Sequence, residues 1–576
     1  MKKILTTGLL VVLVACAEAP GPEQPVADLL LTNARVYTLD WPDPMSDGES
    51  MHPSAVNGWT PDADAVAVRD GKILAVGSAE ALASFAGGTT QTIDLKGATL
   101  LPGLVDTHTH VFQLGLSLSR VNLYDVETEE EAVARVVERA KDVPRGQWIV
   151  GQGWDEGKWA DRYPDKRLLS EAVPDHPVFM RSLHSFAGWV NQAALDRVGI
   201  TAESAVPVGG EMHLMEDGSP SGLFLNRAVP MVENAIPPLD TRQRRANVLR
   251  ALNQMAADGY VTVHDAGLHA EEMAILEELE AQGELPIRVF AMLSVRDEAL
   301  AREWLRRGPD ADSDSFLVTR SVKAFYDGAL GSRGARLLDD YSDMPGHRGV
   351  SGANYGFNEA LTEQMMLAGF QVGIHAIGDA GNRETLDFLE RVITANESQL
   401  QGRHRIEHAQ VIHPDDMSRP RDLALVLSMQ PPHAVEDKAW AEDRLGPERI
   451  HWAYAWRTLR LEGAHLVLNA DNPGSDHNIF YGMHAALTRR DKSREPERGW
   501  YPGESLTIDE VVRAYSRWAA FAGFREELTG VIREGFWADF TAMDVDPFVL
   551  SKSDPGAILN GSIVLTVVDG EVVYQR

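Results

Sequence analysis

The stretch Leu101 to His110, LPGLVDTHTH, joins an apolar run to two histidines and decides how the rest of the chain is interpreted. It begins as a buried parallel strand does and ends in His108 and His110. Side chains two positions apart in a strand point to the same face, so the two imidazoles could hold one metal ion from one side. An isolated pair of this kind more often consists of ordinary polar residues where a strand meets a loop. The remainder of the sequence decides between these readings.

Apolar strand-like runs recur through the middle of the chain. They occupy residues 100–106, 260–264, 287–293, 318–325, 371–375, 404–408, 424–430 and 465–470. Segments with helical periodicity lie between most of them, at residues 242–257, 270–282, 298–307, 359–368, 382–396 and 449–461. Such alternation predicts a parallel sheet, and about eight repeats predict an α/β fold of the (β/α)8 TIM-barrel type, with its catalytic residues at the carboxyl ends of the strands.

The two ends of the chain are rich in short strands instead. Strand-like runs lie at residues 29–39, 65–68, 72–76 and 92–95, and again at 540–543, 563–568 and 572–574. We expect residues 28–98 and 530–576 to form one small β-sandwich, with the barrel at 99–529. Residues 112–239 show no simple βα unit, which predicts a subdomain inserted after the first barrel strand and roofing the barrel mouth.

The first residues indicate export. Two lysines precede an apolar run that is too short to span a bilayer, so residues 1–15 are typical of a signal peptide. The run ends in LVAC, which resembles a bacterial lipobox, and Cys16 is the only cysteine of the chain. We expect Cys16 to carry lipid, residues 16–27 to act as a tether, and the protein to be a periplasm-facing lipoprotein of the outer membrane. The alternative is a plain secretory signal with an incidental cysteine.

Composition excludes one class of partner. The 576 residues include 54 Lys and Arg against 85 Asp and Glu, a formal net charge of −31. Nucleic-acid binding depends on basic side chains that meet phosphates, so no nucleic-acid partner is expected. The sequence predicts a small-molecule substrate and contact with the membrane through the lipid anchor only, and it leaves the oligomeric state open.

Ionisable side chains stand at the carboxyl ends of further predicted strands. Lys323 lies in an apolar run, and His375, His408 and Asp471 end three others. Each of these residues alone is weak evidence, because a single lysine or histidine at such a position is usually structural. Four histidines, a lysine and an aspartate at the ends of five strands are a much stronger pattern. Imidazoles with a carboxylate suit zinc or a similar divalent ion.

These motifs resemble the amidohydrolase superfamily, and most closely its amidohydrolase-3 branch, which includes N-substituted formamide deformylases. The resemblance covers almost all of the chain after the leader. Besides LPGLVDTHTH it rests on WIVGQGWDEGKW (148–159), PVFMRSLHSFAGWVNQAAL (177–195), VKAFYDGALGSR (322–333), HAIGDAGNR (375–383), RIEHAQ (405–410) and SMQPPH (428–433).

The resemblance implies roles for the strand-end residues. His108 and His110 would hold the more buried of one or two divalent ions, and His375 and His408 the more exposed one. Lys323 would be carboxylated by CO2, because its carbamate is an anionic ligand whereas a free ammonium repels metal. Asp471 would contact the metal and act as general base while metal-activated water attacks a carbonyl.

The chain departs from the family pattern in two places. Relatives usually read Gly-Ser-Asp where this chain has Asn469-Ala470-Asp471, and a Gly-Ser-Asp triplet ends five residues later at Asp476. Asp476 is therefore a competitor for the base, but Asp471 is preferred because it directly ends the apolar run. Asn226 stands where relatives often carry Glu.

Weaker candidates for substrate binding come from outside this pattern, and each has a structural alternative. Trp154 and Trp159 are more typical of a hydrophobic core. The full set of these candidates is His184, Trp154, Asp155, Trp159, Arg333 and His433. Asp327 and Asp379 are candidates for orienting metal ligands.

The sequence predicts a metal-dependent hydrolase acting on a C–N bond other than a peptide bond, in an amide or an N-formyl or N-acyl amine. One alternative is a deaminase or cyclic amidase on the same barrel, with a single metal and an uncarboxylated Lys323. Another is a non-catalytic, lipid-anchored binding protein, which the complete set of metal ligands disfavours.

Overall fold

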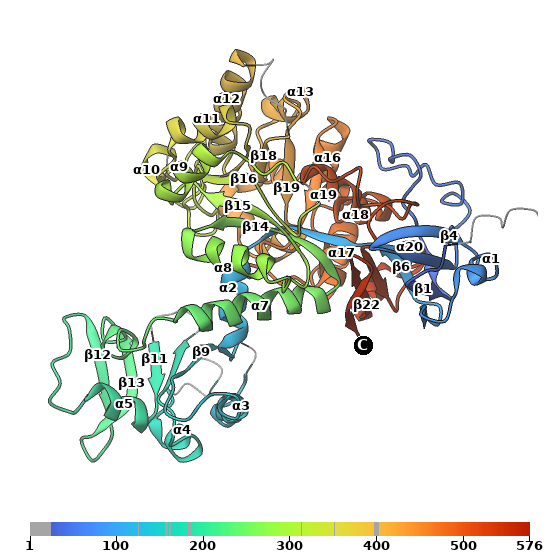
Figure 1. The fold of residues 1–576 in the computed structure, drawn as a ribbon. Coiled ribbons are helices and arrows are strands. Elements are labelled where there is room, and N and C mark those ends of the chain that lie inside the picture. The colour runs from blue at the N-terminus through green and yellow to red at the C-terminus, as the bar shows by residue number, and fades with distance from the viewer. Residues whose placement is uncertain are drawn as a thin grey trace, which may run out of the picture.

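Eight parallel strands form the central sheet of the computed structural model, which describes residues 25–576 except 125, 156–158, 160–162, 183–186, 313, 351 and 397–402 (Figure 1). Their order is β7 (Leu104–Thr109), β14 (Tyr260–Leu268), β15 (Arg288–Ser294), β16 (Leu317–Phe325), β17 (Gln371–Ala376), β18 (Arg405–His408), β19 (Val426–Met429) and β20 (His465–Leu468). The last strand returns to the first: Thr107 Oγ1 donates to the Leu468 carbonyl at 3.1 Å. The His110 N–H donates to the Asn472 carbonyl at 2.8 Å. The predicted (β/α)8 barrel is confirmed.

Helices follow most barrel strands and cover the sheet, as the periodic segments predict (Figure 1). Strands β15 and β19 are buried along their whole length, which explains their unbroken apolar sequence. The helices that come before, between and after the strands are α7 (Thr241–Ala257), α8 (Ala270–Ala281), α9 (Glu298–Arg307), α11 (Glu359–Leu367), α12 (Asp379–Ala395), α13 (Arg419–Asp422), α14 (Pro431–Asp437), α15 (Ala441–Arg449), α16 (Trp456–Leu461), α17 (Ile479–Thr488), α18 (Ile508–Ala514) and α19 (Arg517–Ala522).

The single helix predicted over residues 449–461 is wrong. Helix α15 ends at Arg449, a 3-10 turn covers Ile450–Trp452, and α16 begins only at Trp456. Tyr454 between them has φ 52°, and its N–H donates to the Gln410 carbonyl at 2.7 Å. Its buried hydroxyl donates to Asp437 Oδ2 at 2.6 Å. These tertiary hydrogen bonds replace the helical ones.

Both termini of the described chain contribute to a two-sheet sandwich. One sheet has the order β4-β3-β1-β5 and the other β2-β6-β21-β22-β23. Apolar side chains of both sheets, such as Leu31, Val66, Phe540 and Leu565, pack in one buried cluster. The strands are β1 (Leu29–Thr32), β2 (Arg35–Val36), β3 (Ala65–Arg69), β4 (Lys72–Gly77), β5 (Gln91–Asp94), β6 (Thr99–Pro102), β21 (Phe540–Met543), β22 (Ile563–Val568) and β23 (Glu571–Gln575).

The sandwich differs from the sequence prediction in two details. The expected strand at residues 29–39 is divided at Asn33, whose φ of 53° turns the chain from one sheet to the other. Strand β6 pairs with β21, so the sandwich extends to Pro102 and β7 follows almost at once. The sandwich thus supports the base of the strand that carries His108 and His110.

The inserted subdomain is built on a six-stranded sheet set apart from the barrel (Figure 1). Helix α2 (Val111–Ser119) leads from β7 into it, and α7 leads back to β14. Its strands are β8 (Val121–Asn122), β9 (Ile149–Trp154), β10 (Val178–Ser182), β11 (Ala187–Val190), β12 (Gly210–Leu214) and β13 (Pro220–Asn226). Its helices are α3 (Glu129–Ala140), α4 (Lys166–Ala172), α5 (Gln192–Val198) and α6 (Pro230–Glu233).

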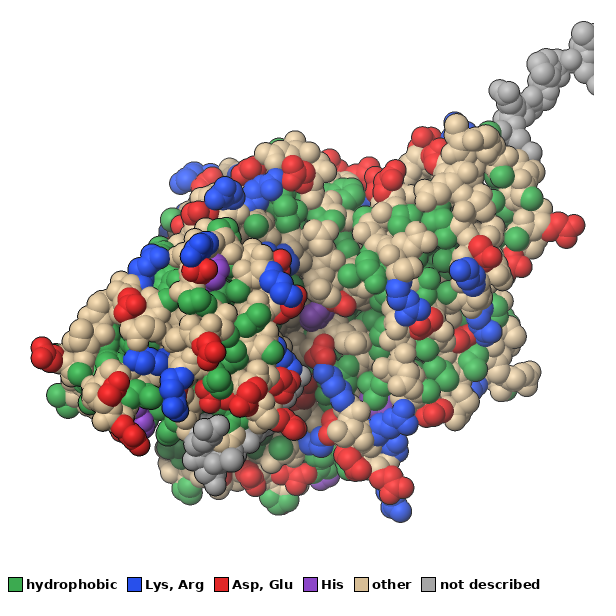
Figure 2. Space-filling view, turned by 90° about the horizontal axis from the view of Figure 1, so that it is seen from below, with side chains coloured by type: hydrophobic (Ala, Val, Ile, Leu, Met, Phe, Trp, Pro, Cys, Tyr) green, Lys and Arg blue, Asp and Glu red, His purple; other side chains and the backbone are tan. Residues whose placement is uncertain are grey.

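The view from below shows the surface hollowed between this subdomain and the rest of the molecule (Figure 2). Figure 1 places the subdomain beyond α2 and α7, which connect it to the barrel, and its expected position over the barrel mouth stays a prediction. The remaining helices are short: α1 (Ala79–Leu82), α10 (Gly352–Tyr355) and α20 (Pro547–Ser553). Within the described ranges, no helix is both long and apolar enough to cross a bilayer.

Candidate metal centre at the barrel mouth

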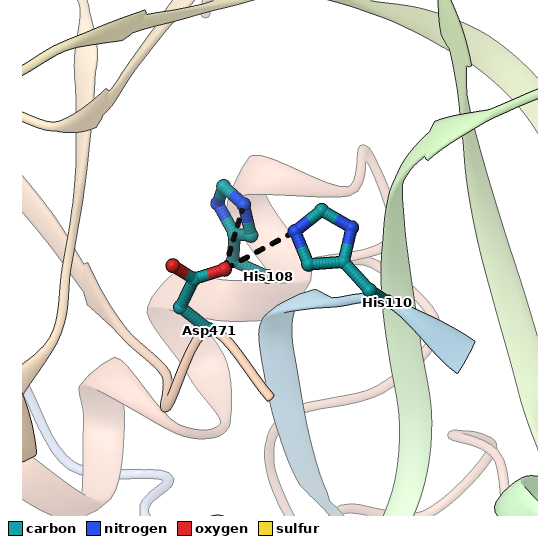
Figure 3. A group of neighbouring side chains, drawn as sticks. All are labelled: His108, His110 and Asp471. Atoms are coloured by element: carbon teal, nitrogen blue, oxygen red, sulfur yellow. Dashed lines mark ion pairs between the residues drawn. The ribbon is translucent and has the colours of Figure 1, made fainter. Parts of the chain in front are cut away.

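Strand β7 delivers His108 and His110 to the same side, as its alternation requires. His108 is fully buried, and its Nδ1 lies 2.7 Å from Glu407 Oε2. This contact leaves Nε2 of His108 facing the barrel mouth. The less buried His110 presents its own Nε2 beside it (Figure 3).

Asp471 meets both imidazoles directly after β20. Its Oδ1 lies 3.4 Å from His108 Nε2 and 3.2 Å from His110 Nε2 (Figure 3). Its backbone has φ 53°, three residues after the end of β20. Asp476 instead forms an ion pair with Lys492. Of the two aspartates considered as base, the structure therefore places Asp471 in the histidine cluster.

His375 and His408 come from the ends of β17 and β18. Their ring centroids are 4.5 Å apart, and that of His408 lies 5.1 Å from that of His108. His408 Nδ1 lies 2.9 Å from Gln430 Oε1, which leaves its Nε2 free to face the mouth. His375 Nδ1 lies 3.3 Å from Asp327 Oδ1, so the predicted orienting aspartate is next to its histidine.

Lys323 completes the group from β16. It is 1% exposed, and its Nζ lies 3.0 Å from His108 Nε2. Burial lowers the pKa of the Lys323 ammonium to about 8. At neutral pH, an amine with a pKa of about 8 is in its uncharged, nucleophilic form far more often than the amine of a surface lysine.

His433 also belongs to the cluster, which makes it more than the surface residue that the sequence allowed. It lies on α14, and its ring is stacked on that of His408 with centroids 6.1 Å apart. Its Nε2 is 4.0 Å from Asp471 Oδ2. Two triplets offer ligand atoms that all lie within 4.8 Å of one another: His108, His110 and Asp471, and His408, His433 and Asp471.

A buried ion pair lies beneath the histidines and was missed by the sequence analysis. Arg405 Nε contacts Glu407 Oε1 at 2.7 Å, and Glu407 in turn contacts His108. Gly373 on the next strand leaves space for this carboxylate, because a Cβ there would lie 2.7 Å from Glu407 Oε1. The available signal was the presence of two charges, Arg405 and Glu407, inside a buried four-residue strand.

The electrostatics keep His108 and His408 neutral and Asp471 charged. Burial lowers the pKa of His108 to about 4, and the neighbouring Lys323 adds to this effect. Burial and His375 hold the pKa of His408 well below its ordinary value. Burial acts to raise the pKa of Asp471, but His108 and His110 outweigh it and hold that pKa well below its ordinary value. Neutral imidazoles around a carboxylate are a donor set that fits a divalent metal ion.

Other candidates from the sequence lie elsewhere. Trp154 is fully buried in the core of the inserted subdomain, where its ring is stacked on Trp159 at 5.6 Å and Nε1 donates to the Met180 carbonyl. Asp155 follows it in the same subdomain. Neither tryptophan lines the barrel mouth, because both are needed to fill the core of the subdomain sheet.

Arg333 pairs with Asp343, to which Nε and Nη2 donate at 3.1 and 2.8 Å. Asp379 accepts the Leu338 N–H at 2.9 Å and so fixes the loop after β16. Asn226 is exposed at the end of β13. His184 and Cys16 lie outside the described residues.

Comparisons with known proteins agree with this geometry. The model of the amidohydrolase family matches residues 91–574. The chain belongs to the amidohydrolase family. This amidohydrolase is 30% identical to the protein LONG AFTER FAR-RED 3 of Arabidopsis thaliana, over 95% of this chain and 92% of that protein.

An enzyme and a solved structure are also similar to this chain over most of their length. The amidohydrolase is 26% identical to the N-substituted formamide deformylase of Arthrobacter pascens, over 95% of this chain and 98% of that enzyme. A solved structure of an uncharacterized metal-dependent hydrolase from Pyrococcus furiosus is 27% identical, with a TM-score of 0.68, over 90% of this chain and 99% of that one.

Proposed function

We propose that this amidohydrolase is a metal-dependent hydrolase of a C–N bond in an amide or an N-formyl or N-acyl amine. The observation that carries the proposal is the convergence of five histidines, a lysine and an aspartate from separate parts of the barrel. Residues with a purely structural role rarely bring so many potential metal ligands into contact at one site. The full-length similarities to a formamide deformylase and a metal-dependent hydrolase support the same reading.

The donor set assigns which residues would hold the metal. His108, His110 and Asp471 form one group of ligands, and His375 and His408 face it from across the mouth. A divalent ion bound there, expected to be zinc, would act as a Lewis acid that activates water and polarises a carbonyl. Lys323 would join the ligands as a carbamate formed with CO2, since its burial favours the uncharged amine that this addition requires.

Asp471 is placed to handle the proton. Its Oδ1 is engaged by His108 and His110, whereas Oδ2 lies on the side of His433. Oδ2 can therefore accept a proton from the attacking water and pass it to the leaving nitrogen, the transfer that hydrolysis of a C–N bond needs. His433, whose Nε2 lies 4.0 Å from Asp471 Oδ2, would donate a hydrogen bond to the substrate carbonyl.

The experiment compares hydrolysis of N-formyl and N-acyl amines by wild-type protein and a His375→Ala variant, each loaded with zinc or manganese. We expect wild type to release amine and acid, and the variant to lose most of this activity because one imidazole ligand is gone. His413→Ala, which removes a histidine outside the centre, is the matched control and should keep the activity. Equal hydrolysis by His375→Ala and wild type would refute the proposal.

A further inference from the structure

A second cavity lies between the inserted subdomain and the two helices that connect it to the barrel. It measures about 530 Å³, the size range of sites for small organic ligands. Its apolar walls come from both sides: Leu116 on α2, Trp148 and Phe179 in the subdomain, and Pro238 before α7. Among the described residues, no member of the metal centre lines this cleft.

The cleft is basic although the chain as a whole is acidic. Five arginines line it against two carboxylates, Asp142 and Glu233. Two of the arginines are already paired, Arg181 with Glu233 and Arg244 with Glu271. The three that remain are Arg120, Arg139 and Arg250, and no ion pair joins any of them to a carboxylate of the described residues.

Two of these three arginines donate hydrogen bonds to neutral side chains, and the charge of Glu233, which pairs with Arg181, also acts on Arg120. Arg120 Nη1 donates to the neutral Gln152 at 3.2 Å, and Arg250 Nη1 donates to the neutral Asn247 at 2.7 Å. Burial lowers the pKa of Arg250, and the charge of Arg139 lowers it further. Guanidinium groups stay protonated at these sites, so the cleft has an excess of positive charge, five arginines against two carboxylates, that suits an anion.

Asn247 supplies a second and independent observation. It is 4% exposed and borders the cleft, and its Nδ2 has no hydrogen-bond partner among the described residues. A buried amide donor without a partner is unfavourable, so a ligand acceptor that reached Nδ2 on binding would be stabilising. The unpaired donor and the unpaired arginines border the same cavity.

We propose that this cleft binds a small organic carboxylate with an aromatic or aliphatic body. The carboxylate would pair with Arg139 and Arg250, because guanidinium groups match carboxylates in geometry and charge. The body would lie against Trp148, Phe179 and Leu116. The proposal does not rest on the hydrolytic activity proposed above.

An occupant of the cleft would bridge the subdomain to the helix that begins at the metal centre. Phe112 lines the cleft and lies two residues after His110, within the first turn of α2. The opposite wall belongs to the subdomain, so the ligand would hold α2 and the subdomain sheet together.

The test is calorimetric titration of the full-length protein with 2-naphthoate, with neutral 2-naphthamide as the matched probe. We expect naphthoate to bind and naphthamide to bind at least roughly tenfold more weakly, because only the acid can pair with arginine. The double variant Arg139→Gln/Arg250→Gln should weaken naphthoate by roughly tenfold or more. Arg302→Gln, which removes one exposed arginine on α9, should leave it unchanged.

Two further measurements keep the result tied to the cleft. Naphthoate binding should be the same before and after treatment with a chelator, since binding that required the metal would belong to the barrel mouth and contradict the proposal.

The thermal unfolding of the double variant should match wild type, and Arg120→Gln should weaken binding independently if the double variant does not fold. No detectable naphthoate binding, or equal binding by wild type and the arginine variants, would overturn the proposal.

Discussion

At the scale of single residues, three of the candidate imidazole ligands have a second side chain beside their Nδ1. Glu407 contacts Nδ1 of His108, Gln430 contacts Nδ1 of His408, and Asp327 lies beside Nδ1 of His375. Contacts on the outer nitrogen fix the ring and direct the other nitrogen into the mouth. This shared arrangement makes the role of individual residues testable.

Replacement of Asp471 by Asn should reduce kcat by about 10²–10⁴-fold, the usual contribution of a general base. The amide preserves shape but accepts no proton at the pH of the reaction. Asp476→Asn is the control, because this aspartate pairs with Lys492 outside the cluster. If both variants lose activity equally, or if Asp476→Asn alone loses it, the assignment of the base is wrong.

Replacement of Glu407 by Gln should weaken metal binding by about 10–100-fold, because His108 loses the carboxylate that orients it. Competition with a chromogenic chelator measures the Kd of the metal. The control is Glu390→Gln, an exposed glutamate that pairs with Arg419 far from the histidines. An unchanged Kd in Glu407→Gln would show that the contact with His108 does not matter for the metal.

The sequence predicted the candidate ligands and one of their supports, Asp327, but not Glu407 or Gln430. His108, His110, Lys323, His375, His408 and Asp471 stand at strand ends, where a barrel collects functional groups, so a one-dimensional pattern was enough to find them. The importance of Glu407 depends on a contact with His108 across 299 positions, and Gly373 is needed to make room for it. His433 follows a strand without ending it, and only the direction of α14 brings its ring onto His408.

At the scale of secondary-structure elements, the contact between α2 and α7 connects the metal centre to the inserted subdomain. The helices approach so closely that a Cβ on Gly115 would lie 2.0 Å from the Asn247 carbonyl oxygen. Such an approach is open only to glycine, because the atom in the way belongs to the backbone.

Gly115→Ala should therefore destabilise the protein by about 1–3 kcal/mol, the usual cost of excess volume in a packed core. Thermal unfolding followed by circular dichroism gives the change as a lower Tm. Gly88→Ala is the matched control, since nothing lies within 4 Å of a Cβ at Gly88. A Tm for Gly115→Ala equal to that of Gly88→Ala would contradict the tight packing of α2 on α7.

Barrel elements were predicted well because their patterns are strong, and failures occurred where local pattern and tertiary contacts conflict. All eight barrel strands lie within a few residues of their predicted positions. The strand at residues 29–39 was predicted unbroken because apolar residues resume soon after Asn33, although the chain changes sheet there. The break at Tyr454 depends on hydrogen bonds to Gln410 and Asp437, which no local sequence pattern reveals.

At the scale of the whole molecule, barrel, sandwich and subdomain are arranged around β7. Strand β6 of the sandwich ends just before β7 begins. The subdomain is joined to β7 by helix α2 (Figure 1). The predicted leader lies within residues 1–24, which are outside the described chain. The proposed export and lipid anchor rest on the sequence around Cys16 alone.

Cys16→Ser should release the protein from the membrane fraction of the expressing cells, because serine offers no thiol for the lipid. Fractionation of cells followed by immunoblotting measures the distribution. Ala17→Ser, which keeps the cysteine, should remain with the membranes. Membrane association of Cys16→Ser at the wild-type level would exclude the lipid anchor.

The most direct test of the account is the metal content of the purified full-length protein, measured by inductively coupled plasma mass spectrometry. We predict one or more divalent ions per chain in wild type and their loss in the double variant His108→Ala/His110→Ala, with wild-type content in His413→Ala. A wild-type protein that binds no divalent ion, or a double variant that retains the full content, would contradict a metal centre at the barrel mouth.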